Sequence, residues 1–460
     1  MVPVVTPEEM AAIDAAAPEP VDVLIGRAGA ATARAALDLL GGGYGRRVAV
    51  VAGKGNNGND GREAARRLTS WGVRATVIPA AELDPWEALP PVDLVIDAAY
   101  GTGFHGEYEA PEVGRIPVLA VDIPSGVDGL TGQVSGRPLK AQRTVTFAAL
   151  KPGLLFHPGR TLAGEVIVAD IGLDVSGARA GVVEAADVTA WVPPRPAVAH
   201  KWQAALVVVA GSPGMTGAAH LCAEAAQRAG AGMVRLISPG VVLDPGLPTE
   251  TVGIHVEKDS AWDTLVVEQL DRSRALVIGP GLGRSEDTTA AVRRCVAAAS
   301  ERAVLVDGDG LTALGRDAGE ALAQRSVPAV LTPHDGEFSR LAGAPPGEDR
   351  MASTRDLAHQ LGAVVLLKGP TTVVAHPDGR VRLVTTGDQR LATAGTGDVL
   401  SGIVGALLAR GADPFDAAAA GAWLHGTAAL SGPPEGLIAR DVVAGIPEAL
   451  LAIRTLEDGD

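Results

Sequence analysis

Short runs of apolar, mostly β-branched residues alternate with helix-compatible segments along most of the chain, and this alternation constrains the fold more than any other feature. The runs in the first part are residues 48–52, 73–78, 94–96, 118–121, 145–147 and 166–168. Those in the second part are residues 206–210, 234–237, 276–278, 304–306, 330–331 and 364–367. Strands that alternate with helices predict parallel, doubly wound sheets of the α/β class.

Two segments add detail to this prediction. Residues 6–40, ahead of the first run, have apolar residues at helix-like spacing and predict a helical segment. Residues 372–375 and 381–384 are apolar runs on either side of Asp378-Gly379, a dipeptide that favours a tight turn between antiparallel strands.

The segment Trp191-Val-Pro-Pro-Arg-Pro196 interrupts the alternation, because proline continues neither a helix nor a central strand. With 460 residues the chain is too long for one ordinary domain. We therefore predict a linker near residues 190–200, with an N-terminal domain at 1–192 and a C-terminal domain at 197–455. The two halves differ in the order of their motifs, so we expect unlike domains.

Charge and composition narrow the classes of ligand. The formal net charge of −15 predicts that the chain attracts neither nucleic acid nor an anionic membrane. A phosphate-bearing ligand then needs local devices such as the N–H groups at a helix N-terminus. Residues 1–10 lack the features of a signal peptide, and no stretch approaches the roughly 18 apolar residues of a membrane span, so we expect a cytoplasmic protein. Cys222 and Cys295 are expected to be buried thiols.

Three predicted strand ends in the first half carry polar side chains. The first continues as Gly53-Lys-Gly-Asn-Asn-Gly-Asn-Asp-Gly61, which contains G-x-G-x-x-G but has Asn59-Asp60 where a P-loop needs Lys-Ser/Thr. In an open parallel sheet, ligands bind beyond the carboxyl ends of strands. Side chains with hard oxygen atoms are expected to converge there, and they suit an alkali cation and a polyhydroxyl ligand: Asn56, Asn57, Asp97, Asp122 and Ser125. Taken singly, the first motif is also typical of a glycine-rich turn, and each aspartate of a helix cap or turn.

The segment Thr393-Ala-Gly-Thr-Gly-Asp-Val-Leu-Ser-Gly402 is the strongest motif of the second half. Apolar residues at helical spacing follow it, so Gly395 and Gly397 are expected at a helix N-terminus with Asp398 in the first turn. Such an end presents free N–H groups to a transferring phosphoryl group, and Asp398 is then the base for the attacking hydroxyl. The alternative is an ordinary acidic residue at a helix start.

Gly-Asn-Asn-Gly-x-Asp-Gly, Asp-x-x-x-Gly-Thr-Gly and Asp-x-Pro-Ser-Gly, in this order, resemble the NAD(P)H-hydrate epimerase domain. Segments 150–154 and 169–172 resemble its closing segments. The resemblance implies that Asp122 is the acid/base, and that the hydrated nucleotide contacts Asp122 together with Asn56, Asn57, Gly58, Asn59, Asp60, Gly101, Thr102, Gly103, Phe104, His105, Gly106 and Glu107. It implies potassium (K⁺) bound by Asn57, Asp97 and Ser125. Asn59 replaces the usual glycine of the family, which matters if that position requires a positive φ.

The Gly-Thr-Gly-Asp motif resembles the anion hole and base of ribokinase-like kinases. Five further motifs narrow the resemblance to the ADP/ATP-dependent NAD(P)H-hydrate dehydratase domain: residues 210–218, 279–283, 307–310, 331–337 and 367–372. It implies that Ala218, Gly281, His334 and Asp398 contact the hydrated nucleotide. The implied contacts with ADP or ATP are Lys368, Gly369, Pro370, Thr371, Thr372 and Gly397. Mg²⁺ is expected with the phosphates, and Glu337 either orients a magnesium-bound water or caps a helix; His334 is alternatively a capping or core histidine.

The combined resemblance implies a bifunctional repair enzyme with a Rossmann-like N-terminal domain and a ribokinase-like C-terminal domain. It epimerises the R and S hydrates of NADH and NADPH and dehydrates the S hydrate by nucleotide-dependent phosphorylation and loss of phosphate. The expected partners are small molecules, and the family also assembles into homo-oligomers. The resemblance leaves open whether ADP or ATP is the donor.

Two other interpretations fit parts of the sequence. The Gly-Thr-Gly-Asp motif alone also fits a vitamin or sugar kinase, fused to a nucleotide-binding module. The first half alone also fits a binding or scaffolding module without turnover. A hydrolase is disfavoured because Ser212 lacks the glycine that begins a nucleophile elbow, and a zinc site because paired Cys/His spacings are missing.

Overall fold

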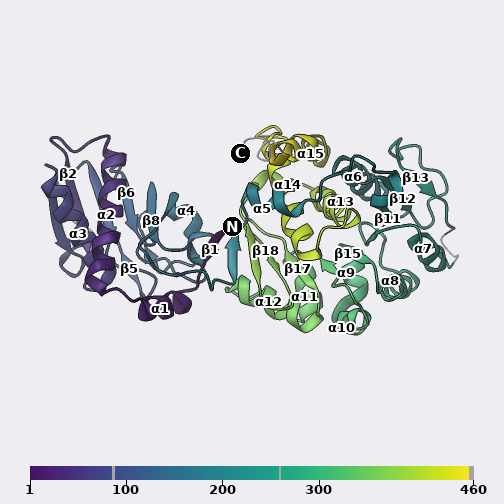
Figure 1. Cartoon of the computed structure of the whole chain (residues 1–460), viewed down its shortest axis with the longest axis horizontal. Helices are drawn as coiled ribbons and strands as arrows, with labels where there is room; N and C mark the ends of the chain where they lie inside the picture. The colour runs from purple at the N-terminus through teal and green to yellow at the C-terminus, as the bar shows by residue number, and fades with distance from the viewer. Residues whose placement is uncertain (85–88, 258–260, 455–460) are drawn as a thin grey trace. The chain divides into compact units, whose positions relative to one another are not determined.

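The computed structural model describes residues 1–84, 89–257 and 261–454, and its chain divides into two compact units (Figure 1). The N-terminal unit is Val2–Ala180, and the C-terminal unit is Gly181–Asp460 together with Met1. The division precedes the proline-rich segment, so residues 181–192 belong to the second unit rather than to the predicted domain 1–192. Val183, Val188 and Val192 bury their side chains in the core of the C-terminal unit, which accounts for the difference. The predicted end at residue 455 lies outside the described residues.

The N-terminal unit contains a parallel six-stranded sheet with the order β3-β2-β4-β6-β8-β9. Its strands are β2 (Arg47–Ala52), β3 (Arg74–Pro79), β4 (Leu94–Ala98), β6 (Val118–Val121), β8 (Arg143–Phe147) and β9 (Glu165–Ala169). The predicted doubly wound sheet is confirmed. The first strand of this sheet, β2, lies between the second and the third, so the winding reverses between β2 and β4. In such sheets this switch point forms a crevice for ligands.

The predicted helical segment at residues 6–40 consists of two helices. The structure has α1 (Pro7–Ala16) and α2 (Val21–Leu40), because the intervening Pro18 and Pro20 lack the N–H groups that a continuous helix requires. Figure 1 shows α2 beside α3 (Asn56–Ser70), and the two helices pack against each other. The other elements of the unit are β1 (Val2–Val4), the short pair β5 (Tyr108–Glu109) and β7 (Gly136–Arg137), and α4 (Gly159–Ala163).

The C-terminal unit has a larger sheet with the order β10-β19-β18-β17-β16-β15-β14-β11-β12-β13. These strands are β10 (Ala180–Val182), β11 (Ala205–Val209), β12 (Met233–Ile237), β13 (Val252–Ile254), β14 (Ala275–Ile278), β15 (Ala303–Val306), β16 (Val330–Leu331), β17 (Val364–Leu367), β18 (Thr372–Ala375) and β19 (Val381–Val384). The strands from β11 to β17 pair in parallel, and β18 and β19 form the predicted antiparallel hairpin. Here the winding reverses between β11 and β14.

Helices cover both faces of this sheet (Figure 1). On one face lie α5 (Ala185–Trp191), α6 (Thr216–Arg228), α13 (Thr396–Ala409), α14 (Pro414–Leu430) and α15 (Ala439–Arg454). On the other lie α7 (Trp262–Leu270), α8 (Glu286–Ala298), α9 (Asp309–Leu314), α10 (Ala318–Leu322), α11 (Asp335–Ala342) and α12 (Arg350–Leu361). Small residues of α6, α13 and α14 fill the core, and they allow the helices to approach closely. Of the helices that the structure describes, none is long and apolar enough to cross a membrane.

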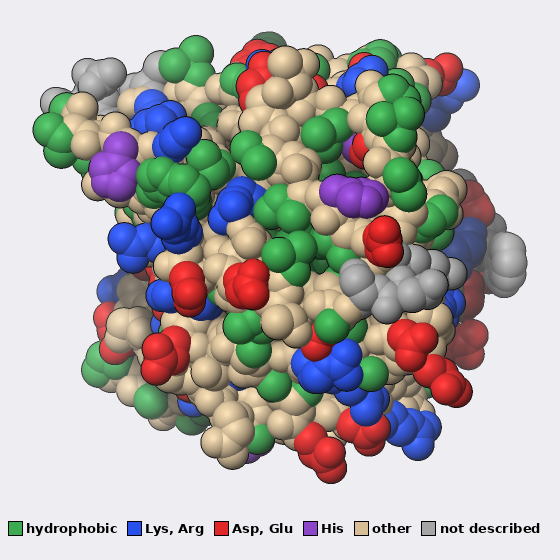
Figure 2. Space-filling view, turned by 90° about the vertical axis from the view of Figure 1, so that its right-hand side faces the viewer, with side chains coloured by type: hydrophobic (Ala, Val, Ile, Leu, Met, Phe, Trp, Pro, Cys, Tyr) green, Lys and Arg blue, Asp and Glu red, His purple; other side chains and the backbone are tan. Residues whose placement is uncertain are grey.

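The surface of the C-terminal unit drawn in Figure 2 carries acidic and basic side chains intermixed, with hydrophobic groups between them. The loop between β12 and β13 contributes exposed apolar side chains to the surface of this unit, notably Val242 and Leu243.

Candidate active sites

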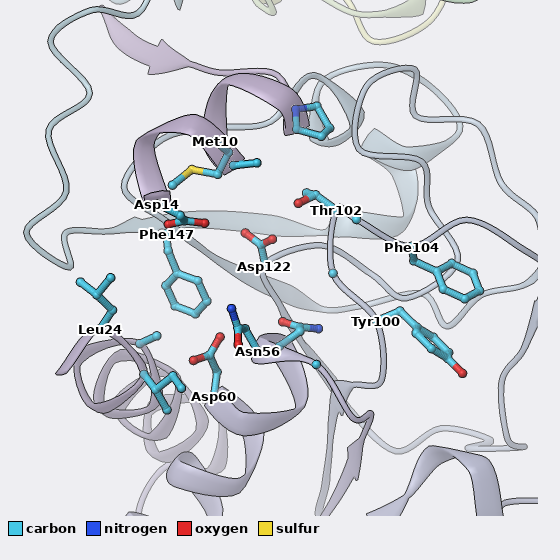
Figure 3. A pocket seen from close by; sticks show the side chains of 18 of the residues that line it. Met10, Asp14, Leu24, Asn56, Asp60, Tyr100, Thr102, Phe104, Asp122 and Phe147 are labelled. Atoms are coloured by element: carbon cyan, nitrogen blue, oxygen red, sulfur yellow. The ribbon is translucent and has the colours of Figure 1, made fainter. Parts of the chain in front are cut away.

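The N-terminal unit has a cavity of about 760 Å³ at its switch point (Figure 3). The loops that follow β2 and β4 meet there so closely that a Cβ atom on Gly53 would lie 1.9 Å from the carbonyl oxygen of Ala99. Glycine is therefore required for the loop to pass. Helices α1 and α2 supply apolar side chains to the lining, including Met10 and Leu24, while α3 and the loops supply polar ones.

Most of the residues predicted for this site line the cavity. They are Asn56, Asn57, Asp60, Gly101, Thr102, Gly103, Phe104, His105 and Asp122. The lining does not include the predicted residues Gly58, Asn59, Gly106 and Glu107, within the part of the chain that the structure describes. Asn59 lies in α3, and its φ is not positive. Asparagine in place of glycine therefore causes no backbone strain at this position.

Asp122 has an unusual backbone and a tightly held side chain. Its φ is +65°, in the left-handed region that non-glycine residues rarely adopt and that is found most often at functional sites. Its Oδ1 accepts hydrogen bonds from Nζ of Lys151 at 2.7 Å and from Oγ1 of Thr146 at 3.0 Å. Oδ2 lies toward Gly101, 3.6 Å from where a Cβ atom of that glycine would be. One carboxylate oxygen is thus anchored, and the other is directed to the glycine-rich loop.

Lys151 is a residue that the sequence analysis missed as part of the site. Its side chain is 1% exposed, and Nζ also donates to Oγ1 of Thr146 and the carbonyl oxygen of Phe147, both at 2.9 Å. A buried ammonium group is stable only when it is paired and fully hydrogen-bonded, as here. The one signal in the sequence is a lysine within the otherwise apolar segment 150–154.

Of the three predicted potassium ligands, Asp97 and Ser125 are buried and bonded to each other, and Asn57 lines the cavity. Asp97 is fully buried and accepts hydrogen bonds from Oγ of Ser125 at 2.6 Å and from its backbone N–H at 2.9 Å. Burial raises the pKa of Asp97, and the hydrogen bonds from Ser125 oppose the shift. The side-chain amide of Asn57 is buried and has no hydrogen-bond partner among the described residues. An orphaned amide oxygen and a buried carboxylate are donors that suit a hard cation.

The switch point of the C-terminal unit brings the loops after β11 and β14 together. The N–H of Gly211 donates to the carbonyl oxygen of Pro280 at 2.7 Å, and Oγ of Ser212 donates to that of Gly281 at 2.9 Å. Gly281 has a φ of +64°, and a Cβ atom there would lie 3.0 Å from Cβ of Ala218. The structure thus places two of the predicted substrate contacts, Ala218 and Gly281, against each other.

The start of α13 has the predicted geometry of an anion site. Gly395 precedes the helix with a φ of +90°, and Oγ1 of Thr396 donates to the carbonyl oxygens of Leu391 and Thr393 at 2.8 and 2.9 Å. A Cβ atom on Gly397 would lie 3.7 Å from Nζ of Lys368. The N–H groups of the helix start and a lysine ammonium therefore face the same space, an arrangement that binds phosphate.

Asp307 links Lys368 to the helix and was missed as a site residue. Nζ of Lys368 donates to its Oδ1 at 2.9 Å, and Oγ of Ser401 in α13 donates to its Oδ2 at 2.7 Å. Although burial pulls the pKa of Lys368 down, the charges of Asp307 and Glu337 raise it, so the side chain stays an ammonium ion. The signal in the sequence was Asp-Gly-Asp-Gly after the run 304–306.

Asp398 is a carboxyl group with a shifted pKa. Burial and, after it, the negative charge of Asp307 raise its pKa to about 7, although the ammonium of Lys368 acts to lower it. A pKa near neutral pH is the value that suits a general base. The environment is therefore unlike that of an ordinary acidic residue at an exposed helix start.

His334 and Glu337 form a reciprocal cap at the start of α11. Nδ1 of His334 accepts from the N–H groups of Gly336 and Glu337 at 3.0 and 3.3 Å, and Oε2 of Glu337 accepts from the N–H of His334 at 3.0 Å. Oε2 also lies 3.6 Å from Nζ of Lys368. Glu337 is thus both a cap and a neighbour of the anion site. The His334 side chain is 57% exposed, so its ring remains accessible to a ligand.

The remaining predicted nucleotide contacts follow Lys368 along the chain. Gly369 and Pro370 lie in the connection between β17 and β18, Thr371 is buried there, and Thr372 begins β18. A Cβ atom on Gly369 would lie 3.3 Å from Nη2 of Arg350 in α12. The connection that follows Lys368 therefore lies next to Arg350, which the sequence analysis did not predict as a site residue.

These features define the class of protein. The C-terminal unit has the fold of the ribokinase-like enzymes, with a glycine-flanked helix start next to a lysine and a carboxyl group. A ribokinase-like superfamily protein of Enterococcus faecalis has the same fold, with a TM-score of 0.53 and 21% sequence identity, covering 60% of this chain and 96% of that one.

Comparisons of sequence identify a family within this class. Residues 206–439 match the family model described as NAD(P)H-hydrate dehydratase, and residues 21–85 and 76–153 match the YjeF-related protein N-terminus. A bifunctional NAD(P)H-hydrate repair enzyme of Mycobacterium tuberculosis is 41% identical over 408 residues, 82% of each chain. One from Escherichia coli is 35% identical, over 83% of this chain and 79% of the relative. The chain belongs to the family of bifunctional NAD(P)H-hydrate repair enzymes and is an enzyme with an epimerase and a dehydratase domain.

A solved structure supports the assignment of the C-terminal unit to the dehydratase domain. The ADP/ATP-dependent NAD(P)H-hydrate dehydratase from Bacillus subtilis, co-crystallised with ATP and Mg²⁺, is 31% identical, with a TM-score of 0.52. The match covers 59% of this chain and 98% of that one.

Proposed function

We propose that the C-terminal unit phosphorylates the hydroxyl group of S-hydrated NADH or NADPH with a nucleotide donor, and that the N-terminal unit supplies this epimer from the R form. The observation that carries the proposal is the start of α13, where Gly397 faces Lys368 and the pKa of the adjoining Asp398 is about 7. A base of this kind next to a phosphate site fits phosphoryl transfer to a hydroxyl group.

Phosphorylation explains how water can be removed from the damaged ring. Hydroxide is a poor leaving group, whereas phosphate is a good one. Asp398 takes the proton of the substrate hydroxyl as its oxygen attacks the terminal phosphorus of the donor. Loss of phosphate, together with a proton from the neighbouring ring carbon, then restores the ring double bond and yields NADH or NADPH.

The nucleotide contacts are proposed on the basis of the anion site. Lys368 and the N–H groups near Gly397 hold the transferred phosphate, and Gly369, Pro370, Thr371 and Thr372 extend this contact toward the rest of the nucleotide. Ala218, Gly281 and His334 are the proposed contacts of the hydrated nicotinamide nucleotide. The relative that was crystallised with ATP and Mg²⁺ supports the proposed nucleotide.

Magnesium is proposed to bind together with the phosphates. Among the described residues, no group of three His, Cys, Asp or Glu side chains is placed to hold a metal ion. One or two carboxylates plus phosphates is the usual Mg²⁺ environment, and Glu337 and Asp307 are the oxygen donors beside Lys368. When bound, the ion neutralises phosphate charge.

The dehydratase rate should depend on pH through Asp398. With limiting substrate, kcat/KM should rise as pH increases through about 7, because the carboxylate form is the base. Lys368→Met removes the positive charge that lowers this pKa, so the acid limb should move to higher pH, while Asp307→Asn should move it to lower pH. A pH profile of each variant measures the shifts. Identical acid limbs in the unmodified protein and in both variants would contradict the role of Asp398 as the base.

The N-terminal unit is proposed to bind K⁺ through Asn57, Asp97 and Ser125. Supporting observations are the buried, partnerless amide of Asn57 and the fully buried carboxyl group of Asp97. A bound cation offsets the cost of burying that carboxylate. Its charge then favours binding of the phosphate-bearing substrate nearby.

Epimer exchange should therefore require potassium. Asn57→Leu keeps the approximate volume but removes the oxygen, and we expect it to raise the K⁺ concentration for half-maximal rate by tenfold or more, roughly the loss of one coordinating group of about 1.4 kcal/mol. The measurement is the rate of epimer interconversion against KCl, with tetramethylammonium chloride holding ionic strength constant. If the rate of epimer interconversion in the unmodified protein did not depend on the K⁺ concentration, the proposed potassium site would be refuted.

A further inference from the structure

A second carboxyl group in the N-terminal cavity has no partner. Asp60 of α3 is 8% exposed, and no hydrogen bond from the described residues reaches its side chain. Asp60 and Asp122 line the same cavity, and Figure 3 shows Asn56 beside Asp60. A buried polar group without a partner is costly, and it persists where function requires it.

Asp60 and Asp122 have opposite surroundings. Asp122 pairs with the buried ammonium of Lys151 at 2.7 Å, which favours its charged form. Among the residues that the structure describes, no cation pairs with Asp60. Burial, then the charges of Asp122 and Asp14, raise its pKa to about 8. The other titratable groups that line the cavity are Lys54, Tyr100, His105 and Lys151. Two carboxyl groups whose environments favour different protonation states are the pattern of an acid and a base.

The substrate chemistry needs such a pair. A dihydropyridine is an enamine, which takes a proton on carbon and adds water at the carbon bound to the ring nitrogen. The hydrate is therefore a hemiaminal, and its stereocentre bears the hydroxyl group. When this centre inverts through a C=N intermediate, the C–O bond breaks and forms again on the opposite face. The first event needs a proton donor for the leaving oxygen, and the second needs a base for the incoming water.

We propose that Asp60 is the general acid and Asp122 the general base of epimerisation, an inference that rests on the proposed epimerase function of this cavity. The nitrogen lone pair forms a C=N bond as the C–O bond breaks, and the hydroxyl leaves as water with the proton of Asp60. A water molecule then attacks the opposite face, Asp122 takes its proton, and the C=N electrons return to nitrogen. Transfer of that proton from Asp122 back to Asp60 restores the enzyme, and the reverse reaction uses the same shared proton in the opposite sense.

The test is the rate of epimer exchange in the full-length chain with K⁺, as a function of pH. For the unmodified protein we expect kcat/KM to fall above about pH 8, where Asp60 loses its proton. Asp60→Asn retains the shape but cannot transfer a proton, so its rate should fall roughly 100-fold or more and lose the alkaline limb. Asp60→Glu restores a carboxyl group and should recover part of the rate together with that limb.

Asp14→Asn is the matched control, because it removes another carboxyl group from the lining of the same cavity. It should keep the alkaline limb and move it to lower pH, since Asp14 raises the pKa of Asp60. The inference is overturned if Asp60→Asn retains more than a tenth of the rate, or keeps the limb, while Asp122→Asn is inactive. If the unmodified protein does not interconvert the epimers at all, the proposed epimerase function fails instead. An unchanged unfolding transition of the N-terminal unit in chemical denaturation shows that this unit is folded in each preparation.

Discussion

Asp398→Asn should lower the rate of nucleotide-dependent dehydration by roughly 10²–10⁴-fold, the range that a lost general base usually costs. The asparagine side chain fits the same space but cannot accept the hydroxyl proton. Nucleotide binding should change little, because Lys368 and the helix N–H groups remain. Epimer exchange should be unaffected, since its proposed residues belong to a different compact unit. Rates of both activities in one preparation, with a nucleotide binding curve, measure this.

Asp441→Asn is the matched control for that variant. Asp441 lies in the first turn of α15, where it is an ordinary acidic residue at a helix start and accepts a hydrogen bond from the N–H of Ile438. If Asp398 acted only in this way, the two substitutions would have similar small effects. A loss of both activities in Asp398→Asn, equal in size, would contradict two independent sites.

Substitution of Asp122 should separate catalysis from stability. Asp122→Asn should slow epimer exchange by roughly 10²–10⁴-fold, because the amide is not a base, while its oxygen still accepts a hydrogen bond from Lys151. Asp122→Ala should also lower the free energy of unfolding of the N-terminal unit by about 3–5 kcal/mol, because it leaves a buried ammonium without its counter-ion. Chemical denaturation monitors the stability, and epimer exchange monitors the catalysis.

A double substitution tests whether the unpaired ammonium of Lys151 causes the loss of stability in Asp122→Ala. Lys151→Met combined with Asp122→Ala removes both charges, so much of the stability lost in Asp122→Ala should return while the activity stays low. Equal stability of Asp122→Ala and the unmodified protein would mean that the pair contributes nothing to folding.

The sheets could be predicted from the sequence because buried parallel strands are continuous apolar runs. Five predicted runs are strands with the predicted bounds, and the others differ by one or two residues at one or both ends: the five are residues 118–121, 330–331, 364–367, 372–375 and 381–384. The short edge strand β13 was missed, since Val252-Gly-Ile254 is brief and contains glycine. The helix break after Ala16 depends on Pro18 and Pro20, which periodicity alone does not reveal.

The sites could be predicted only where a motif is local. Asp122 and Asp398 each stand within a short glycine-containing segment, whereas Lys151 and Asp307 depend on contacts between distant segments. Lys151 reaches Asp122 across 29 positions, and Ser401 reaches Asp307 across 94. Which loops meet is decided by the order of the strands in the sheet, and sequence periodicity does not give that order. The partnerless state of Asp60 likewise follows from packing around the cavity.

The most direct measurement of the central claim follows one reaction mixture that contains the purified chain, S-hydrated NADH, ATP or ADP, and Mg²⁺. Reduced-nicotinamide absorbance and nucleotide cleavage are recorded together, with sugars and vitamin alcohols replacing the hydrate in parallel samples. We predict that one nucleotide is cleaved for each NADH restored, and that the alcohols support no cleavage. Nucleotide cleavage that proceeds with an alcohol, or with the hydrate but without restored absorbance, would contradict the account.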